Sequence, residues 1–451
     1  MATAVLTTDT TPLLRALDRT ALGAILLTPL LLLHARGFAE FTMAVAGICF
    51  LARSTITSDW AWLRTPWLYA GGAWWGWVVL CSLPIPALGL GEGGPSSLLQ
   101  AVLLVRFLVL IAAMEHAILR DPAPRRWFGW TIAASALYIA AQSVIQFTFG
   151  RNLYGEPPGG DGELTGPFGK PRAGPPLARI LFPALVPPVA ALLHQRGIGS
   201  RIAGYALLIA GMTVMVLIGQ RMPLLLTGLG FVVVALLLRP LRPAMLVAGV
   251  MAALLLAASP VVAPAANHRL VSKFTTQMEH FATSQYGQLY ARALEIGVQH
   301  PFTGLGMDGF RHGCEQPRYF RPSFDGSQPD GGGAVICWHH PHNYYFEALD
   351  NGGFVGLALF CWLVLAWLAP MGRALQRHPS PVLVGLFAAA VVQLWPIAST
   401  TGFATMPVAG WSLLLLGWGM AEARWGNVGT AVADGPAPPY IPRDTKMTGV
   451  A

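Results

Sequence analysis

The stretch that decides the fold is WHHPHNYYFEALDNGGFVGLALFCWLVLAWLA, residues 338–369. Its first part is polar and contains three histidines, His339, His340 and His342. Its second part, residues 353–369, is an uncharged apolar run that is long enough to cross about 30 Å of hydrocarbon as a helix. The stretch therefore indicates a histidine-containing polar segment that stands directly before a membrane span.

The composition extends this pattern to the whole chain. Apolar residues make up 54% of the chain and charged residues only 11%, about half the charged share of a typical soluble domain. We expect an all-α polytopic membrane protein with about twelve transmembrane helices. The apolar runs place these spans near residues 19–34, 38–52, 66–83, 97–118, 127–149, 175–194, 202–219, 222–238, 243–264, 353–369, 381–398 and 405–421.

Lysine and arginine set the expected orientation. The positive-inside rule places the loops that carry them in the cytoplasm, and both termini fall on the same side. This distribution accounts for the net charge of +8, so we expect no binding to nucleic acid. The basic residues on this face are Arg15, Arg19, Arg53, Arg64, Arg120, Arg125, Arg126, Arg196, Arg201, Arg239, Arg242, Arg373, Arg377, Arg424, Arg443 and Lys446.

Two long segments lie on the opposite, periplasmic face. Residues 150–174 are rich in glycine and proline. Residues 265–341 form a longer loop, and long loops are commonly functional. Within it, Met278–Gln299 has the periodicity of an amphipathic helix, which we expect to lie at the membrane surface on a stripe formed by Leu289, Ala293 and Ile296. The expected regions are 1–264 with nine spans, the loop 265–341, 342–423 with three spans, and a disordered cytoplasmic tail, 424–451.

Arginines on the periplasmic face are candidate anion ligands. Arg221 lies between two apolar runs, and Pro223 is expected to open the helix that follows. An arginine beside a helix N-terminus suits phosphate, and the alternative is an arginine that only reaches the membrane surface from a tight turn. For Arg292, the alternative is a pair with Glu295 on a solvated helix face. Further candidates are Lys170, Arg172 and Arg179.

The histidines permit more than one interpretation. A neutral imidazole, with an ordinary pKa of about 6.5, can take a proton from a sugar hydroxyl, and His342 is our candidate base. Asn343 is expected to open the next helix, whose positive end disfavours a charged histidine. A zinc site at His339, His340 and His342 is a second interpretation, and a histidine that only lies at the membrane interface is a third.

Two further features stay open at this point. The triplet Asp161-Gly162-Glu163 has the form of a divalent-cation ligand, although in a glycine-rich loop it is more often solvated. Cys314 and Cys337 flank a polar part of the long loop, on the side of the membrane where a disulfide persists. Geometry decides whether they pair.

Three stretches, in order along the chain, resemble the O-antigen ligase and polymerase superfamily, most closely the lipopolysaccharide O-antigen ligases. The turn Gly219-Gln220-Arg221 is similar to the family's periplasmic arginine between two spans. The helix of Arg292, followed by HPFTGLG at 300–306, resembles the family's arginine helix and its glycine turn. His342-Asn343 with Gly353 and Gly356 fits the ligase motif, although Leu357 stands where ligases often have threonine or valine.

The resemblance implies a GT-C-like fold and a metal-independent, inverting glycosyltransferase in the bacterial inner membrane, with its active site in the periplasm and no cofactor. The donor would be a glycan on undecaprenyl diphosphate, and the acceptor a sugar hydroxyl of lipid A–core, both among membrane lipids. His342 would activate the acceptor, and Arg221 and Arg292 would bind the diphosphate. The other expected substrate-binding residues are Gln220, Lys170, Arg172, Arg179, His340 and Asn343.

Other classes of protein remain possible. An O-antigen polymerase or a ligase that attaches glycan to protein would share the donor, and the acceptor is not readable from these residues. A polysaccharide or lipid transporter would also have many spans. It would place charges near the middle of the membrane and show broken spans or inverted repeats, whereas the candidate residues here collect on one face.

Overall fold

The computed structural model describes residues 11–160, 162–320, 336–337, 340–398 and 402–426. Asp161, His339 and the predicted tail beyond residue 426 lie outside these ranges. The described residues are almost entirely helical, and their only β-type pairing is an isolated bridge between Ile85 and Leu90. The prediction of an all-α protein is therefore confirmed.

Among the described residues, eight helical segments are long and apolar enough to cross a membrane. They are α1 (Pro12–His34), α2 (Arg36–Thr57), Gly94–Ile118 (α4, Gly94–Leu103; α5, Val105–Ala113; η3, Met114–Ile118), α6 (Pro122–Phe149), α7 (Gly174–His194), α8 (Ile198–Ile218), Arg239–Val262 (η4, Arg239–Leu241; α10, Arg242–Val262) and α15 (Tyr344–Arg377). The other four predicted spans fall on α3 (Pro66–Cys81), α9 (Arg221–Leu237), α16 (Pro381–Gln393) and α17 (Val408–Trp425). The chain is a polytopic membrane protein, and the total of twelve spans stays a prediction.

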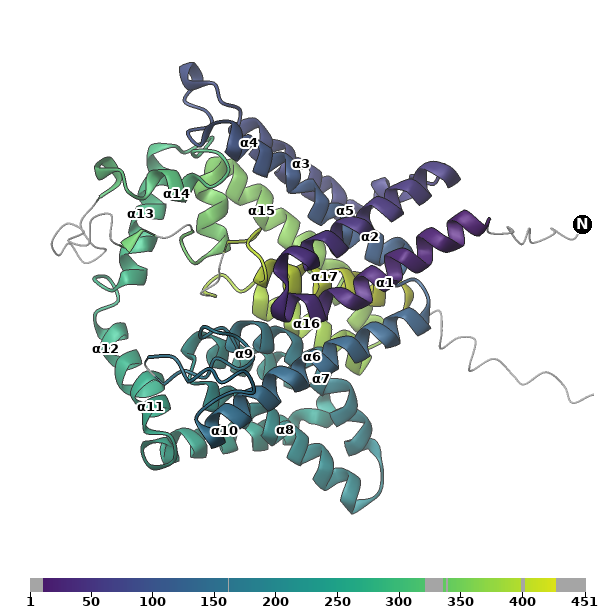
Figure 1. The fold of residues 1–451 in the computed structure, drawn as a ribbon, viewed down its shortest axis with the longest axis vertical. Helices are drawn as coiled ribbons and strands as arrows, with labels where there is room; N and C mark the ends of the chain where they lie inside the picture. The colour runs from purple at the N-terminus through teal and green to yellow at the C-terminus, as the bar shows by residue number, and fades with distance from the viewer. Residues whose placement is uncertain (1–10, 161, 321–335, 338–339, 399–401, 427–451) are drawn as a thin grey trace, which may run out of the picture.

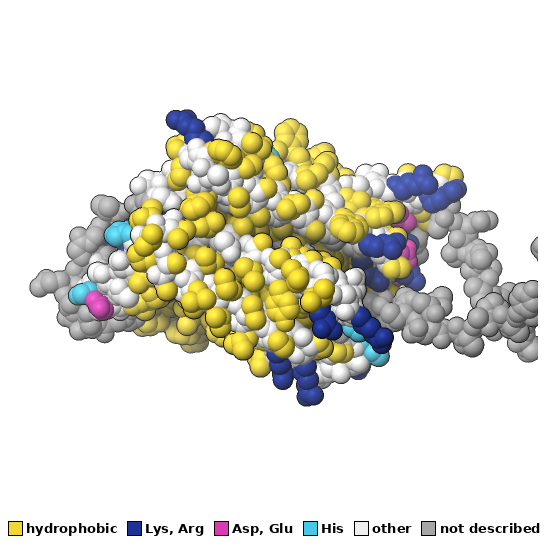
Figure 2. All heavy atoms as spheres, turned by 90° about the horizontal axis from the view of Figure 1, so that it is seen from below, with side chains coloured by type: hydrophobic (Ala, Val, Ile, Leu, Met, Phe, Trp, Pro, Cys, Tyr) yellow, Lys and Arg dark blue, Asp and Glu magenta, His cyan; other side chains and the backbone are white. Residues whose placement is uncertain are grey.

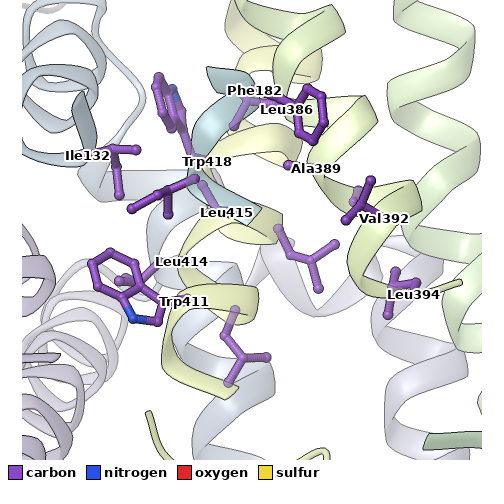
Figure 3. Close-up of a cluster of buried hydrophobic side chains, with 14 of the residues drawn as sticks. Ile132, Phe182, Leu386, Ala389, Val392, Leu394, Trp411, Leu414, Leu415 and Trp418 are labelled. Atoms are coloured by element: carbon purple, nitrogen blue, oxygen red, sulfur yellow. The ribbon is translucent and has the colours of Figure 1, made fainter. Parts of the chain in front are cut away.

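The helix α17 lies in the middle of the bundle (Figure 1). Every residue from Val408 to Ala421 is buried, and a helix that is apolar all round is expected in such a place. Trp411, Leu414, Leu415 and Trp418 of α17 lie with side chains of α6, α7 and α16 in one apolar cluster (Figure 3). The outer surface carries a broad band of apolar side chains with lysines and arginines at its margins (Figure 2), as expected for a bundle surrounded by lipid.

The long loop folds into short helices along one side of the molecule (Figure 1). They are α11 (Pro264–Asn267), η5 (His268–Ser272), α12 (Lys273–Glu279), α13 (Gln285–Gln299), α14 (Gly309–Gly313) and η6 (Pro317–Tyr319). The predicted start of the helix Met278–Gln299 is therefore wrong, because α12 ends at Glu279 and α13 begins at Gln285. Ser284 caps α13, with its hydroxyl oxygen accepting from the Gly287 N–H at 3.2 Å, and serine at this position favours a new helix start.

The apolar stripe of α13 does not lie on the membrane surface as expected. Leu289, Ala293 and Ile296 are at most 1% exposed and belong to a separate small core of the loop itself. Their partners in this core include Leu305, Phe310, Cys314 and Tyr319. The loop is thus a folded unit with its own apolar core, and it holds α13 in a fixed place.

Candidate functional site

The candidate site is built around the N-terminus of α15. Asn343 caps this helix, with its side-chain oxygen accepting from the N–H groups of Tyr345 at 2.8 Å and Phe346 at 3.3 Å. Its amide nitrogen donates to the carbonyl of Pro396 at 2.7 Å. The prediction that Asn343 opens this helix is confirmed. Because its amide is engaged within the fold, Asn343 fixes the residue before it rather than offering a free group to a ligand.

That preceding residue, His342, has a left-handed backbone with a φ of 56°. Among the described residues other than glycine, only Ser58 and Asp308 share a positive φ. Such residues are uncommon, and their strain is often found at functional sites. The half-buried imidazole lies edge-on to Tyr286 of α13, with ring centroids 5.6 Å apart, and 4.6 Å from the ring of His340. The backbone therefore turns His342 toward α13.

The turn at residues 300–306 docks on a kink in α15. At Gly353 the helix has a φ of 65° and a ψ of −164°, a region that is essentially open only to glycine. The Phe354 N–H released by this kink donates to the Pro301 carbonyl at 2.7 Å, and the Leu305 N–H donates to the Asp350 carbonyl at 2.8 Å. Two of the three stretches that carry the family resemblance are thus joined by backbone hydrogen bonds.

A third element, α3, holds the same kink. The indole N–H of Trp77 donates to the carbonyl of Gly352 at 2.9 Å, and Gly356 faces the Trp77 ring. No local sequence pattern singles out Trp77, because its partner lies 275 residues away. The kink is therefore held from the loop on one side and from α3 on the other.

Arg292 is buried inside the long loop. It is 1% exposed, and Glu295 is 8% exposed. Arg292 therefore does not form a solvated pair with Glu295, and it does not lie on an open ligand-binding surface. Its Nη1 donates to the Cys314 carbonyl at 2.8 Å, and its guanidinium stacks on Phe320, 3.9 Å from the ring centroid. A direct contact between Arg292 and a substrate would require this part of the loop to rearrange.

The structure joins Cys314 and Cys337 in a disulfide, with Cα atoms 5.7 Å apart. The same Nη1 of Arg292 lies 2.8 Å from the Cys337 sulfur. The disulfide closes the segment that follows α14, and the guanidinium of Arg292 contacts both of its cysteines. The sequence had left this pairing open, because spacing alone does not determine geometry.

Arg221 and Gln220 lie at the start of α9. The guanidinium of Arg221 donates to the side-chain oxygen of Gln277 in α12, and Arg221 remains half-buried. Gln220 accepts from the Gly174 N–H at 3.0 Å and donates to the Pro171 carbonyl at 2.8 Å. Gln220 therefore ties the loop 150–174 to α9, and Arg221 connects α9 to the long loop.

The basic candidates of the loop 150–174 fall into two kinds. Lys170 and Arg172 are exposed. Arg179, inside α7, is 3% exposed and donates to the Pro175 carbonyl at 2.6 Å, while its Nε has no hydrogen-bond partner among the described residues. Glu163, from the acidic triplet, forms an ion pair with Arg269 of the long loop. The two loops are thus in contact.

Two acidic residues of α15 were missed by the sequence analysis. Asp350 is fully buried, and neither of its carboxylate oxygens has a hydrogen-bond partner among the described residues. Glu347 accepts from the Phe403 N–H at 2.7 Å. Unpartnered buried carboxylates are rare and costly. In the sequence, the only indication of these two residues is that Glu347 and Asp350 stand three positions apart, which places them on one face of a helix.

Comparison with known proteins gives one match. The family model described as O-antigen ligase matches residues 205–361, from within α8 to within α15. No curated protein matches the chain. The matched segment contains Arg221, the long loop with Arg292 and the 300–306 turn, and His342. The match supports the resemblance to the O-antigen ligase and polymerase superfamily over this part of the chain, which holds the candidate site.

Proposed function

We propose that this protein is a ligase that moves O-antigen polysaccharide from undecaprenyl diphosphate to a sugar hydroxyl of lipid A–core in the periplasm. The observation that carries the proposal is the placement of His342. It stands in a left-handed backbone at the head of α15, inside the segment that matches the O-antigen ligase family. Strain of this kind at a histidine with acid–base chemistry is typical of a catalytic position.

In the proposed reaction, His342 is the general base. The acceptor hydroxyl oxygen attacks the anomeric carbon of the donor sugar, and its proton passes to the imidazole. The bond from the anomeric carbon to the diphosphate oxygen breaks, and undecaprenyl diphosphate leaves with the bonding electron pair. Attack from the face opposite the leaving group inverts the configuration. The N-terminus of α15 directly after His342 favours the neutral imidazole that such a base needs.

The leaving diphosphate requires fixed positive charge instead of a metal ion. Arg221 is our choice for this role, because it is half-buried at the first position of α9, where a helix N-terminus adds to its charge. Its planar guanidinium can give two parallel hydrogen bonds to phosphate oxygens. Lys170 and Arg172 are exposed and supply further charge. We assign Arg292 to positioning the loop, since its guanidinium is engaged with Cys314 and Phe320.

The test uses purified protein in detergent with EDTA, lipid A–core and glycan-linked undecaprenyl diphosphate. Wild type should shift the mobility of lipid A–core on a gel, and His342→Ala should not. His378→Ala removes an exposed histidine at the other end of α15 and should behave as wild type. Arg221→Lys should lower transfer strongly despite its retained charge, because the planar fork is lost.

The other outcomes separate the remaining classes. Longer glycan on the undecaprenyl carrier, with lipid A–core unchanged, would indicate a polymerase. No covalent change in either lipid would favour a transporter. Near-normal transfer by both His342→Ala and Arg221→Lys would refute the proposed site, and loss of activity with EDTA would refute the metal-independent reaction.

A further inference from the structure

A cavity of about 590 Å³ lies at the opposite end of α15 from His342. Its walls come from α3, α15 and α17, and its volume falls in the range of small-molecule sites, roughly 300–1,000 Å³. Most of the lining is apolar, and Leu365 and Tyr69 are 64% and 57% exposed. The cavity therefore opens on the outer surface of the bundle, where lipid is the solvent.

The cavity has the length of one leaflet. Its α15 wall runs from Trp362 to Arg373, a rise of about 16 Å at 1.5 Å per residue. This is roughly half of the 30 Å hydrocarbon core. A second apolar cavity, lined by Phe302 and Phe354, shares Trp362 and continues toward the long loop. The first cavity thus spans the half of the membrane that is far from the candidate active site.

Positive charge collects at the far end of this cavity. Arg373 and Arg424 both line it. The guanidinium of Arg424 bonds to the buried Glu115 at 3.1 Å, and the Trp67 indole donates to the same carboxylate at 2.7 Å. Arg373 is exposed and donates to the Ala369 carbonyl at 3.3 Å. Within the described part of the chain it has no carboxylate partner.

We propose that this cavity binds an anionic phospholipid of the cytoplasmic leaflet. An acyl chain lies along the apolar wall between Tyr69 and Trp362, and the phosphate group receives hydrogen bonds from Arg373. An arginine guanidinium suits this contact because it bonds phosphate in a bidentate manner. Tyr69 lies near the start of α3, at the depth where amphipathic aromatic residues meet lipid headgroups. Glu115 holds Arg424 in place, so Arg373 supplies the charge that selects the headgroup.

The test measures which lipid stays bound. Wild type is purified in micelles that contain equal amounts of phosphatidylglycerol and phosphatidylcholine with the same acyl chains, and retained lipids are counted by native mass spectrometry. Wild type should retain phosphatidylglycerol in preference. Arg373→Gln should lower its retention about fivefold, the typical effect of one basic residue at a membrane surface. It should lower the retention of phosphatidylcholine less, because the choline group of that lipid carries a positive charge beside its phosphate. The matched control, Arg239→Gln, removes an exposed arginine outside the cavity and should have no effect.

A second variant tests the apolar part of the cavity. Ala366→Trp fills the wall between Trp362 and Arg373 and should lower the retention of both lipids. Equal retention of the two lipids by wild type would overturn the proposal, and so would an equal loss in Arg373→Gln and Arg239→Gln. Unchanged retention in Ala366→Trp, with folding verified by circular dichroism, would also overturn it. If Ala366→Trp does not fold, the comparison of Arg373→Gln with Arg239→Gln decides.

Discussion

The kink at Gly353 can be tested by a single methyl group. In Gly353→Ala, the added Cβ would lie 2.5 Å from the carbonyl oxygen of Pro301 and 2.5 Å from the carbonyl carbon of Phe302. Both are backbone atoms, so no side-chain rotation can relieve the overlap. The backbone conformation at Gly353, with a φ of 65° and a ψ of −164°, is itself unfavourable for any residue with a Cβ.

The expected loss of stability follows from these two effects. The backbone conformation costs alanine about 1–3 kcal/mol. Relief of the overlap requires the 300–306 turn to move from α15, which breaks the Phe354–Pro301 and Leu305–Asp350 hydrogen bonds, each worth roughly 1 kcal/mol. We therefore expect the free energy of unfolding to fall by about 3 kcal/mol or more. This changes the folded-to-unfolded ratio more than a hundredfold, at about 1.4 kcal/mol per factor of ten.

The assay is equilibrium unfolding in mixed micelles with increasing dodecyl sulfate, followed by tryptophan fluorescence. The control is Gly76→Ala in α3, where an added Cβ meets nothing within 4 Å. It should be neutral or stabilising by up to about 1 kcal/mol, because alanine favours a helix more than glycine does. If Gly353→Ala unfolds at the same dodecyl sulfate fraction as Gly76→Ala, the turn does not hold the kink and the reasoning is refuted.

Two further predictions concern the long loop. The double variant Cys314→Ser/Cys337→Ser opens a loop with a sequence separation of 23, which should lower the free energy of unfolding by about 3 kcal/mol. Dithiothreitol should destabilise wild type in the same assay and leave the double variant unchanged; an effect on both would contradict the prediction. Burial, and next the charge of Arg318, lower the pKa of His300 below its ordinary value. The folded state favours neutral His300. The contribution of His300 to the free energy of unfolding should therefore be fully present above about pH 6.5, and it should be lost as the pH falls toward the lower pKa of the folded state. His300→Gln should reduce the difference between unfolding curves at pH 7.5 and pH 5.5, and an unchanged difference would argue against this assignment.

The sequence was sufficient for features that depend on neighbouring residues. Apolar runs of membrane length coincide with helices, and Asn343 caps α15 because its side chain reaches N–H groups two and three residues ahead. His300 ends α13, as its position before a proline predicts. These features follow from local spacing and backbone chemistry, so one sequence contains the information needed to predict them.

The sequence was insufficient where the partner is distant along the chain. Periodicity placed Arg292 on the polar side of its helix, but the groups that cover it, Cys314 and Phe320, follow more than twenty residues later. A helical pattern states which residues share a face and leaves open what packs against that face. The same reason hid the bond from Trp77 to Gly352 and the contact between Arg221 and Gln277. Each of these contacts depends on how separate helices pack.

These distant contacts also explain how the loop can control the candidate base. The segment from His342 to Gly353 has a left-handed residue at each end, so the rest of α15 does not fix its direction through continuous helix geometry. It is held by Trp77, by the 300–306 turn, and by the bonds from Asn343 to Pro396 and from Phe403 to Glu347, while Tyr286 packs against the imidazole. The turn and Tyr286 belong to the long loop, which has its own apolar core and a disulfide. The position of the candidate base therefore depends on the fold of the long loop as well as on the transmembrane helices.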